Sequence, residues 1–103
     1  MKDLSKMMKQ LQQAQSKMQQ VQEELASKTV EGSAGGGMVK VAVNGRHELL
    51  SIKIDPTVVD PDDVEMLEDL VTAAVNDAQT RADEMARDEM SKLAGGFGLP
   101  GMM

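Results

Sequence analysis

The segment "MVKVAVNGRHELLSIKIDP", residues 38–56, decides the fold of this chain. In its first part valines alternate with small or polar residues from Met38 to Val43, which is the pattern of a strand with one apolar face. Asn44-Gly45 follows directly, and this dipeptide favours a type I′ turn because both residues tolerate positive φ. The segment therefore predicts a β-hairpin that turns at Asn44-Gly45.

The second half of the segment supplies the returning strand, over about residues 47–54, and Asp55-Pro56 ends it. In a tight two-residue hairpin Val39 would pair with Leu50 and Val41 with Glu48, which places the apolar faces of both strands together. A further short strand at about residues 28–31 would complete a three-stranded antiparallel sheet.

A long helix is predicted before the sheet, from Asp3 to about Ser27, where the sequence has no Gly or Pro. Its apolar residues recur at alternating spacings of three and four, as in the a/d seam of a coiled coil. We expect this stripe to form a core or dimer seam. Its members are Leu4, Met7, Leu11, Ala14, Met18, Val21 and Leu25.

A second long helix is predicted to run to about Leu93, with Asp60 as N-cap, Pro61 at the first helical position and Asp62 and Asp63 in the first turn. One stripe of this helix is rich in alanine, which lets another element approach closely: Leu67, Val71, Ala74, Ala78, Ala82 and Met85. The order helix, sheet, helix predicts an α+β domain over residues 1–94, followed by a flexible Gly/Pro/Met tail at 95–103.

The composition narrows the possible classes of protein. The chain has 103 residues, one aromatic residue (Phe97) and no Cys, so it holds one domain with a thin core and neither disulfides nor thiolate metal sites. A thin core favours an oligomer. We find no membrane span and no signal peptide, so we expect a cytoplasmic protein without membrane partners.

Charge is distributed unevenly along the chain, whose formal net charge is −6. Residues 2–22 contain four lysines and one acid, a net charge of +3, whereas residues 55–90 contain twelve acids and two arginines, a net charge of −10. An acidic protein with one basic segment can bind a polyanion through that segment alone.

The basic residues of the first helix lie in a row that points away from the apolar stripe: Lys2, Lys6, Lys9, Gln13 and Lys17. From the helical wheel alone, an ordinary solvated coiled-coil surface is the favoured interpretation. However, such surfaces usually mix signs, and residues 4–22 contain no Asp or Glu. Lysines and amides in a row suit phosphate oxygens, so this row is the candidate site for a partner that presents a line of phosphates.

No other motif predicts chemistry. In "GSAGGG", residues 32–37, Met38-Val39 stand where a phosphate-binding loop needs Lys and Ser or Thr, so a flexible connection between strands is the better interpretation. His47 is the single histidine and is expected to be an exposed residue beside a turn. The acids at 60–65 lack the glycine and ligand spacing of a calcium loop. We expect no enzyme, no metal, no cofactor and no small-molecule substrate.

The chain resembles the YbaB/EbfC nucleoid-associated proteins of bacteria over about residues 4–80. The resemblance is carried by "GGGMVKVAVNGRHELLSIKIDP" and "DDVEMLEDLVTAAVNDA", with Val75 where a Phe is frequent in the family. It implies a homodimer with three-stranded sheets, whose long helices project like the arms of tweezers. It also implies DNA binding of low or variable sequence specificity, and a place in the nucleoid.

A second hypothesis stays open at this point. A coiled-coil adaptor or chaperone-like protein would use the adaptable side chains of Met7, Met8 and Met18 to bind protein partners. Duplex binding and its dependence on salt separate the two hypotheses.

Overall fold

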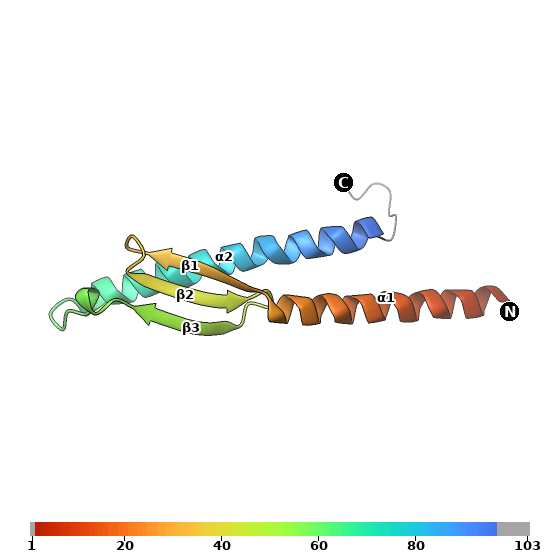
Figure 1. Ribbon diagram of the computed structural model, residues 1–103, viewed down its shortest axis with the longest axis horizontal. Coiled ribbons are helices and arrows are strands. Elements are labelled where there is room, and N and C mark those ends of the chain that lie inside the picture. The colour runs from red at the N-terminus through yellow and green to blue at the C-terminus, as the bar shows by residue number, and fades with distance from the viewer. Residues whose placement is uncertain (1, 97–103) are drawn as a thin grey trace.

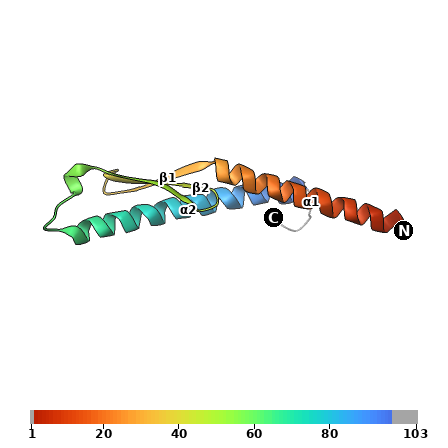
Figure 2. The same ribbon diagram turned by 90° about the horizontal axis from the view of Figure 1, so that it is seen from below.

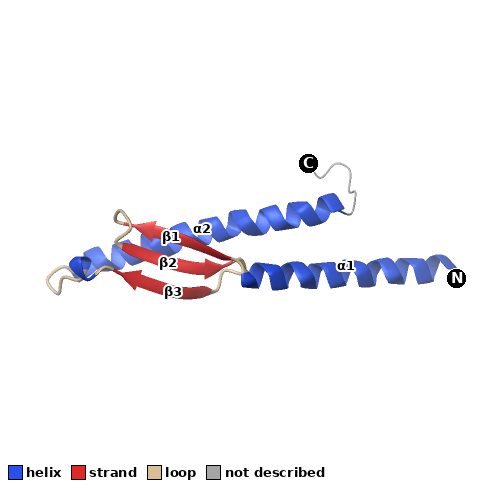
Figure 3. Cartoon of the chain, viewed as in Figure 1, coloured by secondary structure: helices blue, strands red, loops and turns tan. Residues whose placement is uncertain are grey.

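The computed structural model describes the backbone of residues 2–96 and the side chains of residues 3–93. It consists of α1 (Lys2–Ser27), β1 (Thr29–Ala34), β2 (Val39–Asn44), β3 (Leu49–Ile54), a short 3₁₀ turn η1 (Pro56–Val58) and α2 (Val64–Gly96). The strands form one antiparallel sheet in the order β1-β2-β3. The predicted α+β fold is therefore confirmed (Figures 1 and 3). Of the expected tail, residues 97–103 lie outside the described residues.

The elements form an elongated molecule of 73 × 24 × 16 Å. α2 lies under one face of the sheet, and α1 continues the long axis beyond the end of the sheet (Figures 1 and 2). The N-terminal end of α1 and the C-terminal end of α2 both point to the same end of the molecule. α1 is thus an arm that leaves the sheet–helix body.

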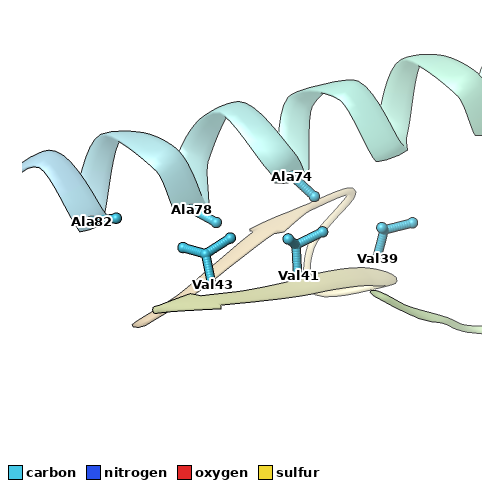
Figure 4. Packing of buried hydrophobic residues seen from close by; sticks show 6 residues of the cluster. All are labelled: Val39, Val41, Val43, Ala74, Ala78 and Ala82. Carbon is cyan, nitrogen blue, oxygen red and sulfur yellow. The ribbon is translucent and has the colours of Figure 1, made fainter. Parts of the chain in front are cut away.

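The core lies between β2 and α2. Three valines of β2 point toward three alanines of α2, as Figure 4 shows, and all six are fully buried: Val39, Val41, Val43, Ala74, Ala78 and Ala82. Alternation along the strand and i, i+4 spacing along the helix place these side chains on facing surfaces. The predicted alanine stripe of α2 is confirmed as the surface that approaches the sheet.

β3 remains uncovered, because α2 packs on β1 and β2. Every residue of β3 is exposed, although four of them are large and apolar: Leu49, Leu50, Ile52 and Ile54. Ile52 pairs with Val41, and Ile54 pairs with Val39. The two isoleucines therefore lie on the sheet face that α2 covers elsewhere.

The predicted hairpin exists, but its predicted register and turn are wrong. Val39 pairs with Ile54, not with Leu50, and Val41 pairs with Ile52, not with Glu48. A bulge at Ala42/Val43 brings Leu49 opposite Val43. At both predicted pairs the shift is four residues, an even number, which is why the apolar faces still coincide.

The turn is longer than two residues because Asn44 and Gly45 are engaged elsewhere. The N–H of Gly45 donates to the carbonyls of Leu25 (2.8 Å) and Lys28 (3.1 Å) at the end of α1. A Cβ on Gly45 would lie 2.8 Å from the Leu25 carbonyl oxygen, so this glycine permits close approach to α1. The positive φ of the turn falls instead on His47, at 67°.

The connection between β1 and β2 is shorter than the whole glycine-rich segment, which was expected to form it. Gly32 to Ala34 belong to β1, and the turn to β2 occupies residues 35–38. Gly35, Gly36 and Gly37 all have positive φ, which explains three consecutive residues without a side chain.

The predicted start of the second helix is wrong by three residues. α2 begins at Val64, and the carboxylate of Asp63 accepts a hydrogen bond from the N–H of Met66 (3.2 Å), as an N-cap does. Asp60 instead closes the preceding turn, where its carboxylate accepts from the N–H of Asp62 (2.9 Å). Because this Asx turn satisfies the backbone locally, Pro61 lies before the helix and not at its first position. The helix continues to Gly96, past the expected end near Leu93.

Candidate nucleic-acid interface

The basic row lies on the arm formed by α1. Lys6, Lys9, Gln13 and Lys17 are all exposed on this helix of 26 residues. The backbone of Lys2 belongs to the same helix, but its side chain lies outside the described residues. Because these positions recur on one side of a regular helix, they offer donors along a line and not at a point.

The lysines near the tip of the arm differ from the cations of α2 in their ion pairing. Within the described residues neither Lys6 nor Lys9 forms an ion pair. On α2, in contrast, Arg81 pairs with Asp77 (3.4 Å) and Arg87 pairs with Asp83 (3.9 Å). The charges of Lys6 and Lys9 are thus available to an external anion, whereas those of Arg81 and Arg87 are partly neutralised.

The apolar stripe of α1 divides into two parts. Val21 and Leu25 are buried within the protomer, where α1 contacts α2 and β2. Toward the N-terminus the stripe is exposed, with exposed fractions of 65% for Leu4, 60% for Met7, 62% for Leu11 and 38% for Met18. The buried end anchors the arm, and the exposed end leaves an apolar surface that none of the described residues covers.

An ion pair that sequence inspection missed joins the base of the arm to α2. Lys28, between α1 and β1, donates to Oε1 of Glu89, whose side chain is only 9% exposed, and Lys92 Nζ lies 3.7 Å from the same oxygen. The hydrogen bond from Lys28 lowers the pKa of Glu89, and the same bond raises the pKa of Lys28. No local pattern indicates a pair separated by 61 residues.

The remaining polar candidates have structural partners. His47 is exposed, as expected, but it lies in the turn and not in the returning strand, with Nε2 2.9 Å from Oδ1 of Asp83. Asp55 begins η1, where its carboxylate accepts from the N–H (2.9 Å) and the hydroxyl (2.8 Å) of Thr57, and these bonds lower its pKa. Asp77 accepts from the N–H of Ser33 (3.0 Å), which lowers its pKa and ties β1 to α2.

A comparison against known families identifies the family of this chain. A sequence profile described as the YbaB/EbfC DNA-binding family matches residues 1–97. The chain belongs to this family. The resemblance inferred from the hairpin and second helix is thereby confirmed.

Relatives of this YbaB/EbfC chain are similar over nearly its whole length. A nucleoid-associated protein of Syntrophobacter fumaroxidans is 60% identical over 95 residues, which cover 92% of this chain and 86% of the relative. A nucleoid-associated protein of Moorella thermoacetica is 56% identical over 101 residues, covering 98% of this chain and 97% of the relative.

A solved structure has the same fold. The crystal structure of the uncharacterized protein HP0035 from Helicobacter pylori superposes with a TM-score of 0.77 at 25% sequence identity, covering 86% of this chain and 94% of that one.

Within residues 2–96, neither helix of the YbaB/EbfC chain is long and apolar enough to cross a membrane.

Proposed function

We propose that this protein is a homodimeric, nucleoid-associated protein that binds double-stranded DNA with low sequence specificity through the lysines of α1. The observation that carries the proposal is the exposed row of Lys6, Lys9 and Lys17 on an arm that leaves the body of the molecule. Membership of a DNA-binding family and relatives named nucleoid-associated proteins support it. The protein then acts in the nucleoid, within the cytoplasm, in nucleoid organisation and gene expression.

Low specificity follows from the residue types on the arm. Residues 2–27 contain no Arg for bidentate reading of guanine and no aromatic side chain for stacking on unpaired bases. Lysine and glutamine side chains donate hydrogen bonds to phosphate oxygens, and these oxygens are the same in every DNA sequence. The acidic α2 repels the duplex and so directs it to α1.

The homodimer is supported by apolar surface that one protomer leaves exposed. Among the described residues, neither β3 nor the N-terminal half of the α1 stripe is covered, with Leu50 54% and Leu11 62% exposed. Exposed apolar surface of this kind marks an interface. A second copy of the chain provides a matching surface by symmetry and doubles the number of lysine arms.

A mobility-shift titration with random-sequence duplex tests the proposal. We expect a shift by the unmodified protein, and loss of that shift when Lys6 and Lys9 are both replaced by Glu. If the double variant binds duplex as tightly as the unmodified protein, the assignment of the row is wrong. If the unmodified protein gives no shift at low salt, the DNA-binding function itself is refuted for this chain.

The same titration addresses the adaptor alternative, which the exposed Met7 and Met8 favour. An adaptor would retain its protein partners in the Lys6→Glu/Lys9→Glu variant, because thioether contacts do not depend on lysine charge. Loss of duplex binding together with unchanged dimer formation would separate the charge row from the apolar stripe.

A further inference from the structure

The direction of the α1 arm is set at its base. Residues 3–13 are all exposed, Ala14 is half-buried, and burial within the protomer is reached only at Val21 and Leu25. A helix of 26 residues is about 39 Å long at 1.5 Å per residue. Contacts in the last two turns therefore control where the lysines of the first turns lie.

Hydrogen bonds from the end of β2 hold the last turn of α1. The N–H of Gly45 donates to the carbonyls of Leu25 and Lys28, and Nδ2 of Asn44 donates to the carbonyl of Ala26 (3.3 Å). These bonds satisfy C-terminal carbonyls that a helix leaves unpaired. They fix the position of the helix end, but they gather around one point.

The Lys28–Glu89 ion pair adds a second point of attachment. Glu89 lies on α2, well beyond the sheet core formed by Ala74, Ala78 and Ala82, and it is buried. Lys28 follows directly after Ser27, the last residue of α1. Val21 and Leu25 pack α1 against β2 and α2 through apolar contact, which is non-directional, whereas the ion pair is a directional contact with α2 at the end of α1 and restricts the angle between the two helices.

We propose that the Lys28–Glu89 ion pair is a positioning device that holds the α1 arm at the angle needed for its lysines to reach successive phosphates. The inference rests on the proposed DNA binding by α1. A rotation of 10° about the base would move the tip of the arm by about 7 Å, given its length of about 39 Å. A hydrogen bond to phosphate tolerates less than 1 Å of such displacement, so an arm without the pair loses contacts at its tip.

Charge reversal distinguishes positioning from direct contact between Lys28 and DNA. We expect Glu89→Gln to remain folded and to bind duplex roughly 3- to 10-fold more weakly, as loss of one or two phosphate contacts predicts. The double variant Lys28→Glu/Glu89→Lys restores the pair with opposite polarity, and we expect its affinity to return to within about twofold of the unmodified protein. Lys92→Gln, which removes the longer contact to Glu89, is the matched control and should change affinity little.

The distance between a spin label on α1 and one on α2 tests the positioning role directly. If the ion pair only stabilised the fold, its removal would not change this distance. The chain has no Cys, so Gln10→Cys on α1 and Thr80→Cys on α2 can be labelled specifically, diluted with unlabelled protein to isolate distances within one chain. In Glu89→Gln the distance distribution should broaden, and in the reversed pair it should narrow again. An unchanged distance distribution in folded Glu89→Gln, or a reversed pair that binds duplex as weakly as Glu89→Gln, overturns the inference.

The two claims fail separately. Absence of duplex binding by the unmodified protein refutes the proposed function, and the spin-label distances then still decide whether the pair holds the arm. Should Glu89→Gln fold poorly, Lys28→Met probes the same pair from its exposed member, with the same expected broadening.

Discussion

Gly32 in β1 lies directly against the backbone of Ala78 in α2. A Cβ at Gly32 would be 2.2 Å from the backbone nitrogen of Ala78 and 2.6 Å from the carbonyl oxygen of Ala74. The alanine stripe alone therefore does not bring the helix this close to the sheet, and the strand contributes a residue without a side chain at the crossing point. Close packing of the sheet on the helix therefore depends on small residues on both sides, the glycine of the strand and the alanines of the helix.

Gly32→Ala is expected to destabilise the fold severely. The added methyl group meets helix backbone, which cannot rotate away as a side chain can, so we expect a loss of about 3 kcal/mol or more, at the upper end of overpacking costs. Thermal unfolding measures it. Gly36→Ala is the control, because Gly36 has positive φ but no atom within 4 Å of its Cβ position. It should cost only about 1–2 kcal/mol from backbone strain, and equal losses in both variants would contradict the packing argument.

Asn44→Ala should be among the most damaging polar substitutions. The buried side chain accepts from the N–H groups of Arg46 and Glu48 (both 3.0 Å) and donates to Ala26 O and Glu48 Oε1. Its loss removes four hydrogen bonds made by a buried side chain, although residues 46–48 of the turn are exposed, and we expect about 2–4 kcal/mol of destabilisation. Asn44→Asp keeps the two accepted bonds and loses the two donated ones. Denaturant unfolding should place it between Asn44→Ala and the unmodified protein.

Stability should fall in acid in part through Glu89. Its pKa in the folded protein is lowered, chiefly by the hydrogen bond from Lys28, so its contribution is present above the ordinary value of 4.5 and is lost as the pH falls through the lowered pKa. The melting temperature of the unmodified protein should therefore converge toward that of Glu89→Gln as the pH falls below 4.5. Asp55 and Asp77 also have lowered pKa values, but they are present in both proteins and cancel. If the difference in melting temperature between the unmodified protein and Glu89→Gln stays constant through the acid range, the charged pair adds nothing to the stability of the folded state.

The order of elements could be predicted from periodicity, whereas contacts between distant residues could not. The alternation in residues 39–43 and the alanine stripe of α2 each rest on several residues, so a single deviation does not change the conclusion. The register depends on one turn, and the Asn-Gly preference was overridden because Gly45 bonds to α1. Tertiary partners of this kind have no signature in the local sequence.

The candidate site shows the same division. Exposure of Lys6, Lys9, Gln13 and Lys17 follows from their place on the helical wheel. The contacts at the base of the arm do not follow from the helical wheel. Val21 and Leu25 are buried within the protomer, whereas Leu4 and Met7 of the same stripe are exposed. This difference depends on where the sheet ends. A heptad pattern specifies an apolar stripe but not its partner.

Ile52→Lys is expected to weaken the dimer without unfolding the protomer. Ile52 is 41% exposed on the uncovered part of β3, so a lysine there remains solvated in the free protomer but is desolvated against a second copy. Sedimentation should detect a shift toward monomer at micromolar concentration. Ser51→Lys places the same charge on the opposite face of the same strand and should leave the dimer intact. Dimers of unchanged stability in Ile52→Lys would exclude β3 from the interface.

The salt dependence of duplex binding counts the lysines that act. Each phosphate contact contributes about 0.9 to the slope of log K against log salt, so a dimer using most of eight arm lysines should show a slope of roughly −4 to −7. Lys6→Gln and Lys9→Gln should each make the slope shallower, because the glutamine retains a donor but releases no counterion. Arg87→Gln is the control, because 81% of the Arg87 side chain is accessible, yet it lies on the acidic α2 beside Asp83. If Arg87→Gln changes the slope as much as the arm variants, the duplex lies on α2 and not on α1. Affinity should also vary little among duplexes of different sequence at matched salt, because lysines bound to phosphates do not read bases.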